Sequence, residues 1–422
     1  MTNHKIHHIQ AHQILDCRGY PTLEVEVTLS NNVKSSAQVP SGKSTGKHEA
    51  FELRDKTDEY NGMNVKHAIN NVNKIINPKL IGHDVREQNQ IDNIMIELDG
   101  TENKEELGAN AIIGVSLAIA RAAASSLGIP LYKYLGGDNA NTLPIPFLSL
   151  INGGKLAGTD LEFQEFFIVP SNAESVSEAL RKGTEVYYSL SKILINKFGK
   201  SLMSTTDEGG FALPIHEPHE ALDFLEKAII DAGYEGQFKF ALDVAASHFY
   251  DYKKNMYILN NKELSQDDML NLYTDLVSKY DLVSIEDPLE QDDFHGFTEL
   301  TKTLKIQIIG DDFLVTNINR LKKAMQTQSA NAILLKVNQI GTLSEALNVA
   351  KYALDNNYAV QVSERSGETE DNIISDIAVA LNCCQMKAGA PARSERTSKY
   401  NRLLKIEQEL GINAKYPTNF FI

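Results

Sequence analysis

The feature that most constrains the fold is a series of short apolar segments that each end in a titratable residue. The segments are FKFALDV, LVSIEDP, IQIIGDD, AILLKVNQ, AVQVSE and CQMKAGA, and the residues in question are Asp243, Glu286, Asp311, Lys336, Glu364 and Lys387. Their separations along the chain are 43, 25, 25, 28 and 23 residues. Because a strand, a helix and two loops need roughly 25 to 30 residues, four of these intervals correspond to one strand–helix unit each.

Uninterrupted apolar runs of this kind predict strands that are buried on both faces, as in a parallel sheet covered by helices. A seventh run, FQEFFIVP, precedes the six and carries Gln164 and Glu165. In a closed barrel of parallel strands, the carboxyl ends meet at one mouth, where active groups gather. We therefore expect an α/β barrel with one catalytic mouth. The alternative is an open doubly wound sheet, which would spread these residues along a line.

The first third of the chain has a different pattern and predicts a smaller α+β domain. Residues 21–30 alternate between apolar and polar, as a half-buried strand does. Residues 87–98 and 109–127 have the apolar spacing of helices. A stretch rich in Gly, Asn and Asp (GGDNANT) follows, and such stretches connect domains. We place an N-terminal domain at residues 1–135 and a barrel domain at residues 136–422.

Composition narrows the classes of function. Among 422 residues there are 41 Lys plus Arg and 56 Asp plus Glu, so the formal net charge is −15. A chain this acidic has no overall field for nucleic acid or anionic lipid, and any phosphate must be held by a local site. Three cysteines, an odd number, indicate reduced thiols, and no secretory signal or uninterrupted membrane span is visible. We expect a cytoplasmic protein that binds a small molecule and neither nucleic acid nor membrane.

The residues at the strand ends suit one kind of chemistry. Asp243, Glu286 and Asp311 would repel one another without a cation between them, and ligands that are all oxygen favour Mg²⁺. Lys336 leaves an apolar strand beside them, where burial and a nearby cation lower the pKa of a lysine and make it a usable base. A lysine base next to Mg²⁺ suits removal of a proton α to a carboxylate. Buried structural ion pairs are the alternative explanation.

A second motif, TTDEGG, places Glu208 beside two glycines, where the backbone can approach a ligand closely. Glu208 is therefore a candidate acid for a leaving hydroxyl group. Glu165 could share a proton with it, and that sharing would raise the pKa of Glu208. A helix N-cap followed by a turn is the alternative explanation of this motif.

Over nearly its whole length the chain resembles the enolase family. The motifs that carry the resemblance include DCRG, LDGTEN, QEF, DEGG, SIEDP, LKVNQIG, RSGETED and GAPARSER. The resemblance implies a modified (β/α)8 barrel with an N-terminal α+β capping domain. It also implies a hydro-lyase that dehydrates 2-phosphoglycerate to phosphoenolpyruvate, and catalyses the reverse, as a homodimer or larger ring.

The resemblance assigns three groups of site residues. The metal ligands are Asp243, Glu286 and Asp311 for one Mg²⁺, and Ser44, on a mobile loop, for a second Mg²⁺ that binds with the substrate. The catalytic residues are Lys336 as the base and Glu208 with Glu165 at the leaving hydroxyl. The substrate-binding residues are Arg365 and Ser366 at the phosphate, together with Lys387 and Gln164.

Two positions depart from the family pattern. Leu156 and Glu364 stand where the family has histidines in its motifs. A like-charge contact at about 4 Å costs roughly 4 kcal/mol at an effective dielectric constant of 20, so an ionised Glu364 cannot face a phosphate unless it is paired. Lys43 and Lys155, on mobile loops, are the predicted partners, and we count all four residues as substrate-binding.

Three functions stay open at this point. The first is dehydration of 2-phosphoglycerate. The second is that of a specialised paralogue acting on another phospho- or phosphono-carboxylate, such as carboxyphosphonoenolpyruvate synthase in phosphonate biosynthesis. The third is a non-catalytic binding protein.

Overall fold

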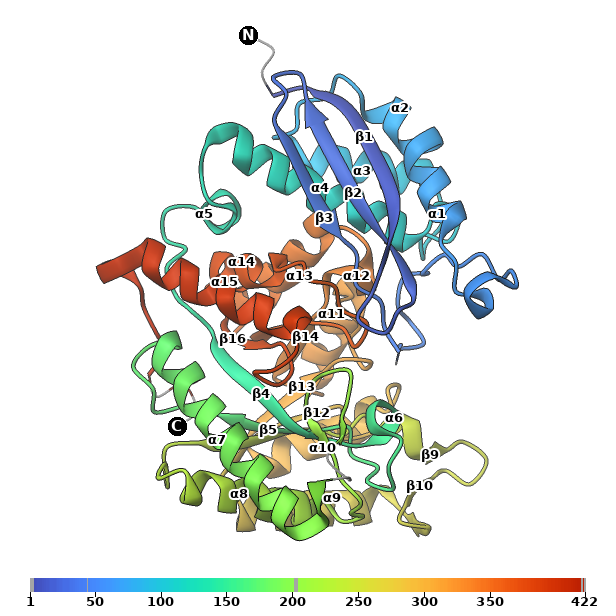
Figure 1. Cartoon of the computed structure of the whole chain (residues 1–422). Helices are drawn as coiled ribbons and strands as arrows, with labels where there is room; N and C mark the ends of the chain where they lie inside the picture. Colours follow the sequence, from blue (N-terminus) through green and yellow to red (C-terminus); the bar gives the residue numbers. More distant parts are fainter. Residues whose placement is uncertain (1–3, 44, 201–203, 419, 421–422) are drawn as a thin grey trace.

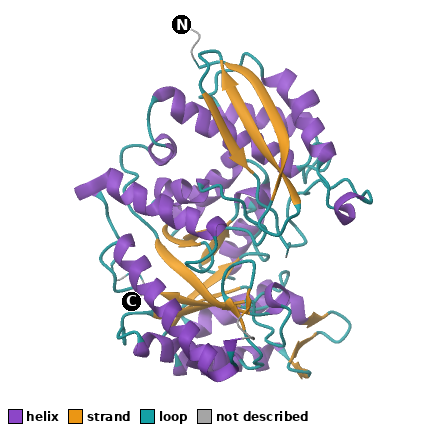
Figure 2. Cartoon of the chain, viewed as in Figure 1, coloured by secondary structure: helices purple, strands orange, loops and turns teal. Residues whose placement is uncertain are grey.

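The computed structural model describes residues 4–43, 45–200, 204–418 and 420 of the chain. In Figure 1 the N-terminal strands and helices, in blue to teal, gather at one end of the molecule, and most of the later strands form a barrel surrounded by helices at the other end. Figure 2 shows the same division by secondary structure.

The N-terminal part is an antiparallel sheet of three strands packed against helices. The strands are β1 (Ile6–Leu15), β2 (Pro21–Leu29) and β3 (Lys34–Gln38), paired in that order. The helices are η1 (Glu59–Gly62), α1 (Lys66–Asn71), η2 (Val72–Ile76), α2 (Asn77–Leu80), α3 (Gln88–Asp99), α4 (Ala109–Leu127) and α5 (Leu131–Gly136). The strand predicted at 21–30 and the helices predicted at 87–98 and 109–127 are confirmed by β2, α3 and α4.

Helix α4 is the core helix of this part. It has 19 residues with a mean hydropathy of 1.4, so by length and composition it could cross a membrane, but 78% of that stretch is buried inside the protein. A Cβ atom at Gly114 would lie 2.7 Å from Val25 and 2.9 Å from Val39, so the glycine lets α4 pack closely on the sheet. This burial is typical of a central helix in a globular fold.

Among the described residues, eight strands close into a barrel. They are β4 (Ile145–Asn152), β5 (Glu165–Val169), β8 (Lys239–Asp243), β12 (Leu282–Glu286), β13 (Gln307–Gly310), β14 (Ala332–Leu335), β15 (Ala359–Ser363) and β16 (Cys384–Lys387). The pairing of β16 with β4 closes the ring. The predicted barrel is therefore confirmed, and the open sheet is wrong.

The barrel is not wholly parallel, which corrects the expectation of a barrel of parallel strands. Strand β5 pairs antiparallel with both of its neighbours, β4 and β8, whereas the other barrel pairs are parallel. Because β5 runs in the opposite direction, its first residue, Glu165, lies at the mouth where the other strands end. A short apolar run looks the same in either direction, so the sequence pattern could not reveal this reversal. Strand β4 was also absent from the predicted series.

Helices and short hairpins surround the barrel. The helices are α6 (Gly154–Ala157), α7 (Val176–Phe198), α8 (Pro218–Asp231), η4 (Ala246–Phe249), α9 (Gln266–Lys279), α10 (Phe294–Leu304), α11 (Ile318–Thr327), α12 (Val337–Ile340), α13 (Leu343–Asp355), α14 (Ile373–Leu381), α15 (Ser394–Leu410) and η5 (Gly411–Asn413). The additional strands are β6 (Ser204–Thr205), β7 (Phe211–Ala212), β9 (Tyr250–Asp251), β10 (Met256–Leu259) and β11 (Lys262–Leu264).

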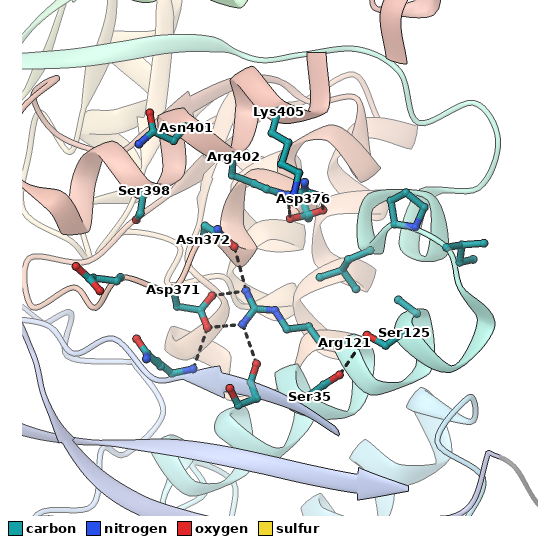
Figure 3. A pocket seen from close by; sticks show the side chains of 17 residues that line it. Ser35, Arg121, Ser125, Asp371, Asn372, Asp376, Ser398, Asn401, Arg402 and Lys405 are labelled. Carbon is teal, nitrogen blue, oxygen red and sulfur yellow. Dashed lines mark hydrogen bonds and ion pairs between the residues drawn. The ribbon is translucent and has the colours of Figure 1, made fainter. Parts of the chain in front are cut away.

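A polar groove of about 830 Å³ lies where the N-terminal part meets the barrel helices (Figure 3). At this junction Arg121 of α4 donates hydrogen bonds of 2.6 and 2.7 Å to the two carboxylate oxygens of Asp371. Asp371 also accepts the backbone N–H of Gln38 at 2.9 Å, which ties strand β3 to the barrel. Burial raises the pKa of Asp371, but Arg121 outweighs burial and holds that pKa below its ordinary value.

We expect Asp371→Ala to lower the free energy of unfolding by about 3 kcal/mol, because it leaves the Arg121 guanidinium partly buried without its counter-ion. Urea denaturation measures the change. The control is Asp84→Ala, which removes a surface ion pair with Arg86 and should cost less than about 1 kcal/mol. Equal losses in the two variants would contradict a special role for the junction pair.

Candidate active site

The candidate site lies at the mouth where the barrel strands end. Asp243 ends β8, Glu286 ends β12, and Asp311 directly follows β13. These strands are neighbours, and the register places Glu165 opposite Asp243 and Asp243 opposite Glu286. Three carboxylates on adjacent strands are therefore held side by side by the backbone hydrogen bonds of the sheet.

One cavity at this mouth collects most of the predicted site residues. Those that line it are Leu156, Gln164, Glu165, Glu208, Asp243, Asp311, Lys336, Glu364, Arg365, Ser366 and Lys387. Glu286 does not line this cavity, but its carboxylate accepts a hydrogen bond from Lys387, which does. Lys43 and Lys155 have exposed side chains, and the position of Ser44 lies outside the described residues.

Lys387 lies at the centre of the carboxylates. Its Nζ donates hydrogen bonds to Glu165 Oε2 at 2.9 Å, Asp243 Oδ2 at 3.3 Å and Glu286 Oε1 at 2.8 Å. Gln164 Nε2 donates to Asp243 Oδ2 at 3.0 Å. Burial lowers the pKa of Lys387, but Glu165, Glu286 and Asp243 outweigh burial and raise that pKa well above its ordinary value.

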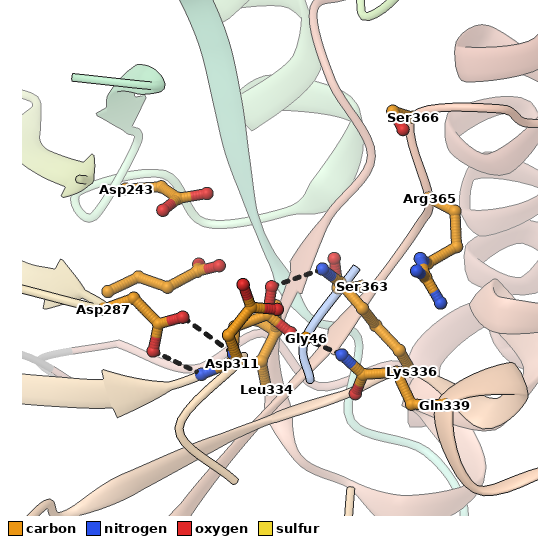
Figure 4. Close-up of polar contacts among 12 residues, drawn as sticks. Gly46, Asp243, Asp287, Asp311, Leu334, Lys336, Gln339, Ser363, Arg365 and Ser366 are labelled. Atoms are coloured by element: carbon orange, nitrogen blue, oxygen red, sulfur yellow. Dashed lines mark hydrogen bonds and ion pairs between the residues drawn. The ribbon is translucent and has the colours of Figure 1, made fainter. Parts of the chain in front are cut away.

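Lys336 is held by Asp311 on the next strand. Its Nζ lies 2.5 Å from Asp311 Oδ2, and Gln339 Nε2 donates to the other oxygen of Asp311 at 2.8 Å (Figure 4). Burial lowers the pKa of Lys336, but contact with Asp311 outweighs burial and raises it. The lowered pKa that we predicted for Lys336 is thus wrong for this arrangement, because the carboxylate beside it stabilises the ammonium form.

Glu165 and Glu208 differ in their protonation. Burial opposes ionisation of Glu165, but the Lys387 ammonium and a hydrogen bond with Glu208 lower its pKa to about 2. The pKa of Glu208 is raised well above its ordinary value by burial and then by the charges of Glu165 and Glu364. Of these two groups, Glu208 is therefore the one that favours its protonated form, as a general acid must.

Arg365 and Ser366 form a turn directly after β15. Arg365 donates to Asn338 Oδ1 at 2.8 Å and to Glu49 Oε2 at 3.0 Å. Ser366 Oγ accepts the backbone N–H of Lys43 at 2.7 Å, so the N-terminal loop touches this turn through its backbone. A guanidinium and a hydroxyl group that line one cavity can bind a phosphate.

Glu364 has a different partner from the ones we predicted. Arg396 Nη1 lies 2.7 Å from Glu364 Oε2, and both side chains are buried. Lys43 and Lys155 are exposed instead, so their prediction as partners is wrong. Burial raises the pKa of Glu364 to about 7, although Arg396 opposes that rise. Arg396 belongs to α15, thirty-two residues further along the chain, and no local pattern marks that contact.

The sequence analysis did not identify Asp287, which connects two loops at the mouth of the barrel. Asp287 has a φ of +43°, and its two carboxylate oxygens accept the backbone N–H groups of Asp311 and Asp312 at 2.9 and 2.7 Å (Figure 4). Asp287 thereby joins the loops after β12 and β13. Its signal in the sequence was the SIEDP motif, which we used only for Glu286.

The carboxylates at the mouth fit a divalent cation. Among the described residues, the group of three carboxylates whose oxygens all lie within 4.8 Å of one another is Asp287, Asp311 and Asp312, which contains only Asp311 of the predicted ligands. Asp287 is committed to backbone N–H groups. Burial and neighbouring negative charges raise the pKa of Asp243 to about 6 and that of Glu286 well above its ordinary value, although Lys387 opposes both shifts. These shifts indicate negative charge that Lys387 does not balance. A hard cation with oxygen ligands, such as Mg²⁺, would balance it.

Comparisons with known proteins agree with this geometry. The family model of the enolase N-terminal domain matches residues 6–135, and that of the enolase C-terminal TIM barrel domain matches residues 140–422. An enolase of Methanocaldococcus jannaschii is 54% identical over 99% of this chain and 98% of its own length. An enolase of Thermococcus gammatolerans is 54% identical over 98% of this chain and 97% of its own length. The chain therefore belongs to the enolase family.

Proposed function

We propose that this enolase-family hydro-lyase removes water from 2-phosphoglycerate to form phosphoenolpyruvate, and catalyses the reverse reaction. The observation that carries the proposal is one cavity that is lined by Lys336, by Glu208, whose pKa is raised by burial, and by the turn of Arg365 and Ser366. The relatives described above bear the name enolase, and they support neither a phosphonate-pathway paralogue nor a non-catalytic binding protein.

In this proposal Lys336 Nζ, in its neutral form, takes the proton from C2 of the substrate. Mg²⁺ held by Asp311 would favour that form, because its positive charge would offset the carboxylate that otherwise stabilises the ammonium. Glu208 gives its proton to the hydroxyl group on C3, which leaves as water while a double bond forms between C2 and C3. Arg365 and Ser366 bind the phosphate. Mg²⁺ held by Asp243, Glu286 and Asp311 would supply positive charge that stabilises the carboxylate as negative charge builds on it.

Three finer features belong to the proposal, of which the first two rest on the family resemblance and the third on the sequence pattern. The first is a second Mg²⁺ that binds together with the substrate and Ser44. The second is a homodimer or larger homo-oligomer. The third is a domain boundary between residues 135 and 136, which falls at the C-terminal end of helix α5.

The test is NMR of the purified protein with Mg²⁺ and 2-phosphoglycerate in D₂O, following the C2 proton and the ³¹P signal. We expect phosphoenolpyruvate to form. Removal of Mg²⁺ with EDTA should reduce the rate by at least about a hundredfold, because a bound metal supplies several kcal/mol of charge stabilisation, and added Mg²⁺ should restore it. Absence of both C2 exchange and elimination with Mg²⁺ present would overturn the proposed function.

A further inference from the structure

The end of the cavity near Glu208 contains three buried carboxyl groups and two buried cations. Lys387 contacts Glu165 at 2.9 Å, and Arg396 contacts Glu364 at 2.7 Å. Among the described residues no lysine or arginine lies within ion-pair distance of Glu208, and its Oε2 atom is buried without a hydrogen-bond partner. Lys387 also contacts Asp243 and Glu286, so its single positive charge is shared among three carboxylates. The charges of the residues that the structure describes leave no unpaired cation beside Glu208 and Glu364 for a bound anion.

The guanidinium of Arg396 makes its contacts with groups of the protein itself. Its guanidinium donates to the backbone oxygens of Arg365 at 2.8 Å, Ser366 at 2.8 Å and Asp207 at 3.1 Å. Its exposed fraction is 0%. Arg396 therefore holds the turn after β15 and the loop of Glu208 in place, and Glu364 is the carboxylate in contact with it. No positive charge of Arg396 faces the cavity for a bound anion.

Leu156 completes this end of the cavity with an apolar surface. It lines the same cavity as Glu208 and Glu364, and its exposed fraction is 6%. An apolar side chain, a protonated acid and a paired carboxylate offer a place to a small uncharged group that donates a hydrogen bond. They offer no place to a second anion, because ionised carboxylates accept hydrogen bonds and repel negative charge.

We propose that Glu364, fixed by Arg396, determines specificity at this end of the cavity by accepting a substrate with an uncharged group at C3 and rejecting one with an acidic group there. The inference rests on the proposed function and refines its substrate class to 2-phospho-carboxylates whose C3 substituent is neutral. Glu364 acts on the choice of substrate, whereas Lys336 and Glu208 carry out the proton transfers.

The experiment compares two non-reacting ligands that differ only in the C3 group. These are 2-phospholactate, with a methyl group, and 2-(phosphonooxy)malonate, with a carboxylate. Calorimetric titration of the full-length protein with Mg²⁺ present measures Kd for each ligand. We expect the wild-type protein to prefer 2-phospholactate by about a hundredfold, and Glu364→Gln to reduce that preference by about tenfold or more, because the like-charge contact is removed.

Two variants serve as controls. Glu364→Asp keeps the negative charge and should keep most of the preference. Asp376→Asn removes a buried carboxylate of α14 that pairs with the half-buried Arg402 at 2.6 Å, outside this cavity. It should leave the preference unchanged, so a change confined to Glu364→Gln cannot come from general loss of packing.

If the Glu364→Gln variant does not fold, the pH dependence of the ligand preference in the wild-type protein tests the inference instead. The groups that face Glu364 are Arg396 and Tyr400 of α15, Glu368 after β15, Glu165 of β5, and Glu208. Because the pKa of Glu364 is raised to about 7, its charge is lost as pH falls from 8 to 6. The preference should shrink over that range by more than the difference in phosphate ionisation between the two ligands accounts for.

The outcomes separate this inference from the proposed function. A preference that is unchanged in Glu364→Gln, or unchanged between pH 8 and pH 6 in the wild-type protein, overturns the role of Glu364. Absence of any binding of 2-phospholactate to the wild-type protein contradicts the proposed function itself. Tight binding of both ligands by the wild-type protein also overturns the inference.

Discussion

Lys336→Ala is expected to abolish exchange of the C2 proton of 2-phosphoglycerate with solvent, and with it the formation of phosphoenolpyruvate. Lys336 leaves strand β14 beside Asp311 and is the lysine we assign as the base. Removal of a general base lowers the rate by roughly a hundred- to ten-thousandfold, so we expect a loss of at least about a thousandfold. Deuterium incorporation at C2, followed by ¹H NMR, measures the change.

The Lys336→Arg variant distinguishes the role of Lys336 as a base from the role of its positive charge. Arginine keeps a positive charge that can pair with Asp311, but it does not lose its proton in a protein. We expect this variant to fold and still to be inactive in C2 exchange. Lys302→Ala, an exposed lysine on α10, is the matched control and should retain wild-type exchange. Exchange that survives in either variant at position 336 would remove Lys336 from the role of base.

Glu208→Gln is expected to stop elimination of water while C2 exchange continues. Glutamine has nearly the size of a protonated glutamic acid and the same zero charge, so the electrostatics of the cavity hardly change. Its amide does not act as an acid, and departure of the C3 hydroxyl should slow by at least about a hundredfold. The ³¹P spectrum reports elimination, and the C2 signal in D₂O reports exchange in the same sample.

The control for this variant is Glu217→Gln, an exposed carboxylate immediately before helix α8. It should leave both exchange and elimination unchanged. If Glu208→Gln forms phosphoenolpyruvate at the wild-type rate, Glu208 is not the acid. If it loses exchange and elimination together, Glu208 acts on the whole site and not on the leaving group alone.

Much of the fold could be predicted from short stretches of sequence. The alternation at residues 21–30 predicted strand β2, and Gly128 ends helix α4 in the left-handed conformation expected of a helix C-terminus. The spacing of Glu286, Asp311 and Lys336 predicted successive strand–helix units, which are now β12 to β14. These predictions succeeded because strand and helix periodicity depends on neighbouring residues along the chain.

Prediction of the site was less complete. The sequence indicated which titratable residues end the strands, and one cavity collects most of them. It did not indicate that Arg396 would pair with Glu364, that Asp287 would join two loops, or that Lys336 would contact Asp311 closely enough to raise its pKa. Each of these contacts is made between residues far apart in the chain, and their chemical environment exists only after packing.

The sequence by itself determined the number and spacing of the strand–helix units, the residues available at the strand ends and membership of the enolase family. Only the tertiary structure decided the direction of β5, which brings Glu165 to the mouth, and the partners of Glu364 and Lys387. The physical reason is the range of the interactions. Local conformation follows from nearby residues, whereas strand direction, ion pairing and pKa depend on which distant segments exclude water from one another.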